Sequence, residues 1–102
     1  LIDFLLSACR LQQCGQLTFP IMCSLIEKEV FVLPDAMMIN ATRFAFERLK
    51  LVVELAAGLA LGAILSQSDR LEKKLQHIAV ILCGGNIDLT VPLPWLDEEK
   101  HS

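Results

Sequence analysis

The apolar pattern of the chain changes along its length, from helical spacing in the middle to an unbroken run near the end. Between Pro34 and Val53, apolar residues recur every three or four positions, which is the spacing of one helix face. Proline is tolerated in a first turn, and Asp35 suits the positive end of the helix dipole. We therefore expect a helix from Pro34 to near Val53, and a second, almost wholly apolar helix over 56–67.

Two shorter segments have the composition of β-strands. Residues 30–33 are rich in β-branched and aromatic types, and the unbroken apolar run 78–82 leads into Cys83 and two glycines. A run of this kind is typical of a strand covered on both faces, as in a parallel sheet. Tandem glycines allow a sharp turn, and ligands of open α/β sheets bind beyond the carboxyl ends of the strands. We expect Cys83 to face a ligand pocket there.

The remaining elements are short. We expect helices over 2–12 and 21–28, and a polar turn or short helix over 66–74. Prolines at positions 92 and 94 exclude a long regular element after Asn86. The order of strand, helix, helix, strand and glycine turn predicts the closing part of an α/β domain, which by itself says little about function.

The size, charge and apolar content of the chain limit the kinds of partner that it can bind. The 102 residues fit one small domain or a piece of a larger one, and a net charge of −3 argues against nucleic acid. The apolar share is 54%, so part of the apolar surface is expected to pack on something absent from this chain. The uninterrupted run 55–65 is shorter than the roughly 20 residues of a membrane-spanning helix. A core helix is the better interpretation, and we expect Gly58 and Gly62 to serve close packing of that helix on a sheet.

Four cysteines, at positions 9, 14, 23 and 83, form no Cys-x-x-Cys pair, and the two histidines lie far from the first three. Neither a zinc site nor a disulfide framework is indicated, and reduced thiols favour the cytosol. The apolar N-terminal segment 1–10 lacks a basic region and contains Asp3, so it does not read as a signal peptide.

Several segments together resemble the final region of the serine racemase family, which is shared with serine and threonine dehydratases. They are residues 46–54 (FERLKLVVE), 57–58 (AG), 65–67 (LSQ), 81–90 (ILCGGNIDLT) and Trp95. The resemblance covers 19–96, without a gap from 36 to 67 and with one inserted residue near 27–30. Residues 1–18 do not match, and 97–102 are expected to form a disordered tail.

This resemblance implies a pyridoxal-phosphate enzyme of fold type II, the tryptophan-synthase-β-like fold. Members of the family remove the α-proton of serine and return it to the other face, or eliminate water to give pyruvate and ammonia. For a full-length parent, the resemblance implies pyridoxal 5′-phosphate as cofactor, ATP and Mg as activators, serine as substrate, a homodimer and a cytoplasmic location. The net charge and the short apolar run argue against a nucleic-acid partner and a membrane partner.

The resemblance also assigns candidate site residues. Cys83 matches the serine or cysteine that meets the pyridine nitrogen of the cofactor, with Gly84 and Gly85 beside it; the alternative is a buried structural thiol. Asn86 and Lys50 match positions that contact the nucleotide activator. The alternatives for these two are a turn asparagine and a solvated lysine.

Glu54 matches the glutamate of a Glu-Pro-Ser/Thr-Ala-Gly segment close to the active site of the family. Here Leu55 and Ala56 replace the proline and the hydroxyl residue. A glutamate in an apolar run should be paired, hydrogen-bonded or have a raised pKa, which makes Glu54 a candidate near the active site.

The family's other functional segments are not in this sequence. No lysine has the Ser-x-Lys-x-Arg-Gly context of the Schiff-base lysine, and the phosphate-binding glycine loop and the acidic metal ligands are missing. Without that lysine the chain alone is expected to be inactive, with no catalytic residue of its own. Two interpretations stay open: a C-terminal fragment of a serine racemase-like enzyme, or a non-catalytic truncated or spliced product that acts as an interaction module. A small membrane-associated protein is disfavoured by the short apolar run.

Overall fold

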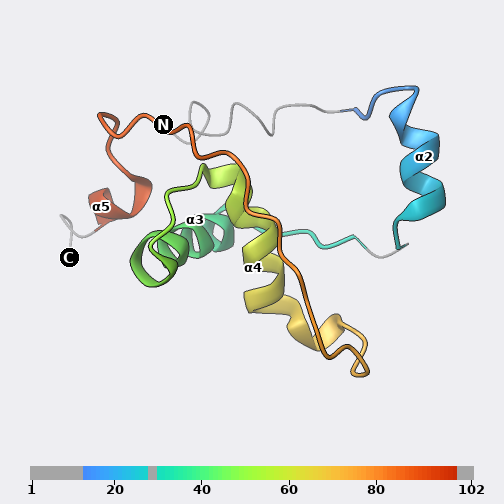
Figure 1. Ribbon diagram of the computed structural model, residues 1–102. Helices are drawn as coiled ribbons and strands as arrows, with labels where there is room; N and C mark the ends of the chain where they lie inside the picture. The colour runs from blue at the N-terminus through green and yellow to red at the C-terminus, as the bar shows by residue number, and fades with distance from the viewer. Residues whose placement is uncertain (1–12, 28–29, 99–102) are drawn as a thin grey trace.

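The computed structural model describes residues 13–27 and 30–98, and the regular elements in this part are all helical (Figure 1). Three α-helices, α2, α3 and α4, are joined by shorter turns, and a last short helix, α5, follows a long irregular segment. The bounds are α2 Thr18–Leu25, α3 Asp35–Phe44, a π-helix Ala45–Leu49, a 3₁₀-helix Leu55–Ala57, α4 Gly58–Gln67, a 3₁₀-helix Ser68–Arg70 and α5 Pro94–Glu98.

Helices α3 and α4 pack directly on each other, and two glycines of α4 lie at their contact. A Cβ atom on Gly58 would lie 2.2 Å from Thr42 Oγ1 and 2.6 Å from the Met38 carbonyl oxygen. A Cβ atom on Gly62 would lie 2.7 Å from Leu33 Cδ2. The expectation that these glycines serve helix–sheet packing is therefore wrong, because the surface they approach is another helix.

The core consists of two clusters that share Phe46. In one, Ala45, Val53 and Leu61 are among the buried residues, with the partly buried Val80 and Leu82 packed against them. In the other, Trp95 joins Met38 and Leu55, and this contact brings α5 onto the main body. Residues from the middle and from the C-terminal end of the family resemblance therefore meet in the core.

The helix expected from Pro34 to near Val53 ends earlier. After α3 the backbone widens into the π-helix and then leaves helical geometry at Lys50, which has a left-handed φ of 58°. The Leu51 N–H donates to the Ala45 carbonyl at 3.1 Å, closing the helix end. Residues 51–54 then continue outside any helix, so the expected end near Val53 is wrong.

Within the described residues no β-strand forms, so the α/β class is not confirmed by this chain. The segment after residue 75 runs past α4 without regular structure (Figure 1). Val80 and Leu82 face the core, whereas Ile81 is 80% exposed. The expectation of a strand buried on both faces is therefore wrong for this chain. A strand requires a hydrogen-bonded neighbour, and residues 78–82 make no backbone hydrogen bond to another segment in the described ranges.

The other strand-like segment, 30–33, is also extended and unpaired in the described part. It is held against the end of α4, where Gln67 Nε2 donates to the Val32 carbonyl at 3.0 Å. The Arg70 guanidinium lies 4.7 Å from the centre of the Phe31 ring. These side-chain contacts, rather than backbone hydrogen bonds to a neighbouring strand, hold residues 30–33 against α4 and the turn that follows it.

The remaining expectations have mixed outcomes. Helix 56–67 is confirmed as the 3₁₀-helix and α4, and the turn or short helix within 66–74 is confirmed by the 3₁₀-helix at 68–70. The helix expected over 21–28 is shifted to α2, which buries none of its residues. Helix α5 extends two residues into the expected tail 97–102, and the helix expected over 2–12 lies outside the described residues.

Candidate cofactor-facing site

Cys83 stands at the end of the extended segment with its thiol exposed. Leu82, immediately before it, packs on the core, and Gly84, immediately after it, is partly buried. The thiol is therefore exposed to solvent, while the residues immediately before and after Cys83 both contact the rest of the chain. This differs from the alternative of a buried structural thiol.

Gly84 is held by Glu54, thirty positions earlier in the sequence. The Glu54 N–H donates to the Gly84 carbonyl oxygen at 2.6 Å. Gly84 has a φ of 79°, a left-handed conformation that favours glycine. A Cβ atom built on it would lie 2.3–2.4 Å from Cγ, Cδ and Oε1 of Glu54. The Glu54 side chain thus occupies the space in which a side chain at position 84 would stand.

Gly85 has a different environment. A Cβ atom on Gly85 would meet only the Val52 carbonyl oxygen at 3.7 Å, an ordinary contact, and the residue is exposed. The two glycines therefore differ in function: Gly84 is required by the packing of this chain, and Gly85 leaves an open surface beside the thiol.

The replacement of the family proline by Leu55 leaves the backbone before it in a compatible conformation. Glu54 has φ −71° and ψ 160°, the extended geometry that a following proline would impose. The Leu55 side chain is 4% exposed and packs with Met38 and Trp95. A proline at position 55 would restrict Glu54 to this extended backbone by its ring; here the packing of Leu55 in the core helps to hold it instead.

Of the three alternatives expected for the Glu54 carboxylate, the first two, an ion pair and a hydrogen bond, do not hold in the described part of the chain, where it accepts no hydrogen bond. Glu54 is half-buried, and its backbone rather than its carboxylate makes the bond to Gly84.

The two predicted nucleotide contacts, Lys50 and Asn86, are both exposed. The Lys50 ammonium donates to the Glu47 carbonyl at 2.6 Å and so caps the π-helix. Asn86 lies in the irregular segment after the glycines. The described contacts do not join these two residues to each other.

Sequence analysis missed a small polar turn just beyond Asn86. Oδ1 of Asp88 accepts hydrogen bonds from the Thr90 N–H at 2.9 Å and from the Thr90 hydroxyl at 2.6 Å. The Thr90 side chain, followed by its backbone N–H, lowers the pKa of the Asp88 carboxyl from its ordinary 3.8. The Asp-x-Thr spacing is the signal that could have predicted this turn.

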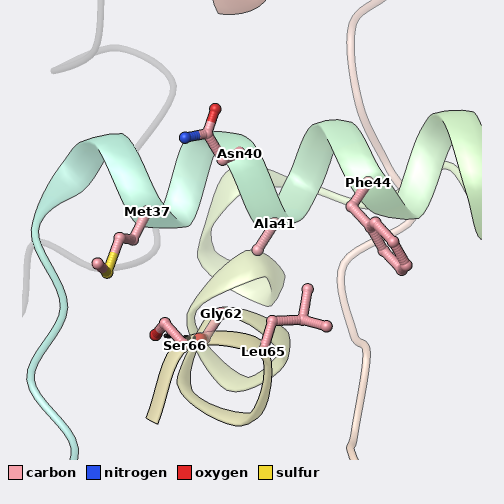
Figure 2. A pocket seen from close by; sticks show the side chains of 7 residues that line it. All are labelled: Met37, Asn40, Ala41, Phe44, Gly62, Leu65 and Ser66. Atoms are coloured by element: carbon pink, nitrogen blue, oxygen red, sulfur yellow. Dashed lines mark hydrogen bonds between the residues drawn. The ribbon is translucent and has the colours of Figure 1, made fainter.

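A shallow pocket of about 200 Å³ lies between α3 and α4 (Figure 2). Its lining is mostly apolar and includes none of the predicted site residues: Met37, Asn40, Ala41, Phe44, Gly62, Leu65 and Ser66. The Ser66 hydroxyl donates to the Gly62 carbonyl at 2.6 Å, so it is already used within α4. This pocket is a gap between two packed helices rather than a chemical site.

Other kinds of site are not found in the part of the chain that the structure describes. No three metal-ligating side chains come together there, and no helix there is long and apolar enough to cross a membrane. The thiols of Cys14 and Cys23 are exposed and free.

The chemistry of the residues at the end of the extended segment suits the nitrogen of a pyridine ring. An exposed thiol is a weak hydrogen-bond donor that can face a ring nitrogen, and the exposed Gly85 has no close neighbour at the position of a Cβ atom. At Gly84, by contrast, Glu54 occupies that position. The fit therefore involves Cys83 and Gly85, with Gly84 and Glu54 as their support.

Comparison with known proteins gives a consistent set of relatives, although no family model matches the chain. The chain is 33% identical to serine racemase of Homo sapiens and 36% identical to that of Rattus norvegicus, each over 88 residues. These alignments cover 85% of this chain and 26% of the relatives. Serine racemase of Dictyostelium discoideum is 33% identical over 76 residues.

A solved structure is similar as well. The crystal structure of a pyridoxal 5′-phosphate-dependent aspartate racemase matches with a TM-score of 0.81 and 39% identity, over 89% of this chain and 28% of that chain. The present chain thus spans about a quarter of the length of the proteins it matches.

Proposed function

Because the chain corresponds to a C-terminal portion of the serine racemase family, we propose that it forms one wall of a pyridoxal-phosphate site in an amino-acid racemase. The observation that carries the proposal is the exposed thiol of Cys83, held between the core residue Leu82 and the fixed Gly84. Within this wall, Cys83 would hold the ring nitrogen of the cofactor, with the exposed Gly85 close by in the chain.

The bound cofactor supplies an electron sink for removal of the α-proton of the substrate. The Cys83 thiol is a neutral partner for the ring nitrogen and holds it by a weak hydrogen bond without adding charge. Gly84 and Glu54 keep the thiol in place. No lysine here has the family's cofactor-binding context, so the covalent anchor and the groups that move the proton belong to the remainder of the enzyme.

For substrate, we infer serine, since the curated relatives are serine racemases. The aspartate racemase makes aspartate the competing candidate. The wider proposal for the whole enzyme includes elimination of water from serine as a side reaction, ATP and Mg as activators with Lys50 and Asn86 at the nucleotide, a homodimer and a cytoplasmic location.

A chimeric enzyme tests this function. Residues 19–96 replace the matching quarter of rat serine racemase, and bound cofactor, D-serine and pyruvate are measured. We expect the chimera to bind the cofactor and racemise serine, and Cys83→Ser to preserve both. Cys83→Ala should alter the pH dependence of the cofactor absorbance, whereas Cys23→Ala, at an exposed thiol in α2, should not. A soluble chimera without bound cofactor would refute the proposal.

The second candidate function, a non-catalytic interaction module, is favoured by one observation. Helix α2 buries none of its residues, and its apolar side chains are largely exposed, including Ile21 at 57% and Leu25 at 79%. An isolated chain that binds a partner polypeptide through α2, combined with a chimera that fails to bind cofactor, would support this function instead.

A further inference from the structure

The bond from Glu54 to Gly84 differs from the other backbone hydrogen bonds that lie outside helices. Within the described residues, the other such bonds join positions no more than six apart in sequence, whereas this one joins positions thirty apart. It is therefore the backbone contact that fixes the end of the extended segment relative to the turn before α4.

Fixing the Gly84 carbonyl has a geometric consequence for Cys83. The φ and ψ angles of Gly84 relate its carbonyl group to the peptide that joins it to Cys83. With the carbonyl held by the Glu54 N–H and φ at 79°, the rotation of that preceding peptide is restricted. The position of Cys83 is restricted with it, since Leu82 packs on the core on the other side.

The Glu54 side chain restricts the same residue. Glycine can adopt many conformations, so a single hydrogen bond would leave Gly84 able to rotate. Three atoms of the Glu54 side chain lie where a Cβ atom on Gly84 would stand, so they lie against its Cα atom. Glu54 thus contacts Gly84 through its backbone and through its side chain.

We propose that Glu54 is a positioning residue, which sets the direction of the Cys83 thiol by holding Gly84 in its left-handed conformation. The inference rests on the proposed function, in which that thiol meets the cofactor ring. A thiol is a weak donor, and hydrogen bonds weaken steeply when misaligned, so orientation matters more here than for a stronger donor. Glu54 acts through its shape and its backbone, not by contact with the substrate.

The test uses the full chain with its other three cysteines replaced by serine. The rate of Cys83 alkylation by iodoacetamide is measured between about pH 6 and 11, a range that reaches the plateau of an ordinary thiol and so separates the thiolate fraction from the reactivity of the thiolate itself. Glu54→Ala removes the side chain that covers Gly84. Glu54→Gln removes the charge but keeps the shape. Glu72→Ala, at an exposed glutamate paired with Lys74, is the control.

Glu54→Ala keeps the backbone hydrogen bond to Gly84 but removes the packing of the side chain on it, so we expect the high-pH plateau of the rate to rise roughly fivefold, the population change of an average destabilising substitution. Glu54→Gln and Glu72→Ala should keep the wild-type plateau. Equal plateaus for wild type and Glu54→Ala would overturn the inference. So would a Glu54→Gln plateau equal to that of Glu54→Ala, because charge rather than shape would then be the cause.

The chimeric enzyme separates this inference from the function it rests on. If Cys83→Ala leaves the cofactor absorbance unchanged at every pH, the proposed function fails, whatever Glu54 does to alkylation. If Cys83→Ala changes the absorbance but Glu54→Ala does not, only the positioning role of Glu54 fails. We expect Glu54→Ala to reproduce part of the Cys83→Ala change, and the double variant to show no further change.

Discussion

Phe46 and Trp95 meet edge to face, with ring centroids 5.2 Å apart and ring planes at 71°. Trp95 is 4% exposed and joins α5 to the core, while Phe46 lies in the π-helix and packs on both core clusters. This pair links the C-terminal end of the described chain to the middle helices.

The aromatic pair should contribute to stability beyond the area it buries. We expect Trp95→Ala to lower the free energy of unfolding by about 3–5 kcal/mol. A double-mutant cycle of Phe46→Leu and Trp95→Leu should give a coupling of about 0.5–1.5 kcal/mol. Urea denaturation followed by circular dichroism measures both. Phe19→Leu, in α2, should change stability by less than about 0.5 kcal/mol, and strictly additive effects of the two leucine variants would contradict the pairing.

The two glycines of α4 should differ in their tolerance of alanine. A Cβ atom on Gly58 would meet the backbone oxygen of Met38, which cannot move alone, so Gly58→Ala should cost at least about 3 kcal/mol. A Cβ atom on Gly62 would meet the flexible end of Leu33, so Gly62→Ala should cost only about 1 kcal/mol. Thermal unfolding compares the two, and Leu33→Ala added to Gly62→Ala tests relief of the clash. Equal losses for both glycines would argue against the close approach of α3 and α4 at Gly58.

A matched comparison is offered by Gly84 and Gly85. Gly84→Ala combines a left-handed φ with a clash against Glu54, and should cost at least about 2 kcal/mol. Gly85→Ala should change stability by less than about 1 kcal/mol, since its Cβ atom would make an ordinary contact. Hydrogen exchange of the Glu54 amide gives a second measurement: the amide should lose protection in Gly84→Ala and keep it in Gly85→Ala. Full protection in both variants would contradict the bond to Gly84.

The turn at Asp88 should show a pH dependence with a definite sign. Thr90 lowers the pKa of the Asp88 carboxyl below 3.8, so the turn's contribution to stability is present above that pH and is lost as the pH falls through the folded-state pKa. Thr90→Val removes the side-chain hydrogen bond and keeps the backbone one, so the Asp88 pKa should rise part of the way to its ordinary value. Carboxyl carbon chemical shifts measure it. Thr18→Val, in α2, should leave the Asp88 pKa unchanged, and an unchanged pKa in Thr90→Val would count against the turn.

Local patterns in the sequence predict the helices of the core better than their ends. The apolar run over 56–67 predicts α4, because helix propensity and apolar spacing are properties of neighbouring positions in the sequence. The end of the preceding helix at Lys50 has no such signal, since a left-handed residue at a helix end is usually glycine or asparagine. Local propensity therefore extends the helix past the point where the structure ends it.

The strands and the support of the candidate site depend on distant residues. Val80 and Ile81 have the composition of a strand, but a strand also needs a neighbour with which to pair. The family resemblance singles out Glu54 and Gly84 separately. Nothing in the sequence pairs them, because their hydrogen bond joins positions thirty apart. Only the folded chain shows that one supports the other.

The ammonium group of Lys50 is already in use, since it caps the end of the π-helix through the Glu47 carbonyl at 2.6 Å. Any phosphate that recruits this ammonium must compete with that carbonyl, and Lys50 already holds a left-handed backbone. Binding of an anion by Lys50 would therefore break the hydrogen bond to the Glu47 carbonyl and loosen the last helical turn. The loss of that bond would offset part of the electrostatic attraction between the anion and the ammonium group.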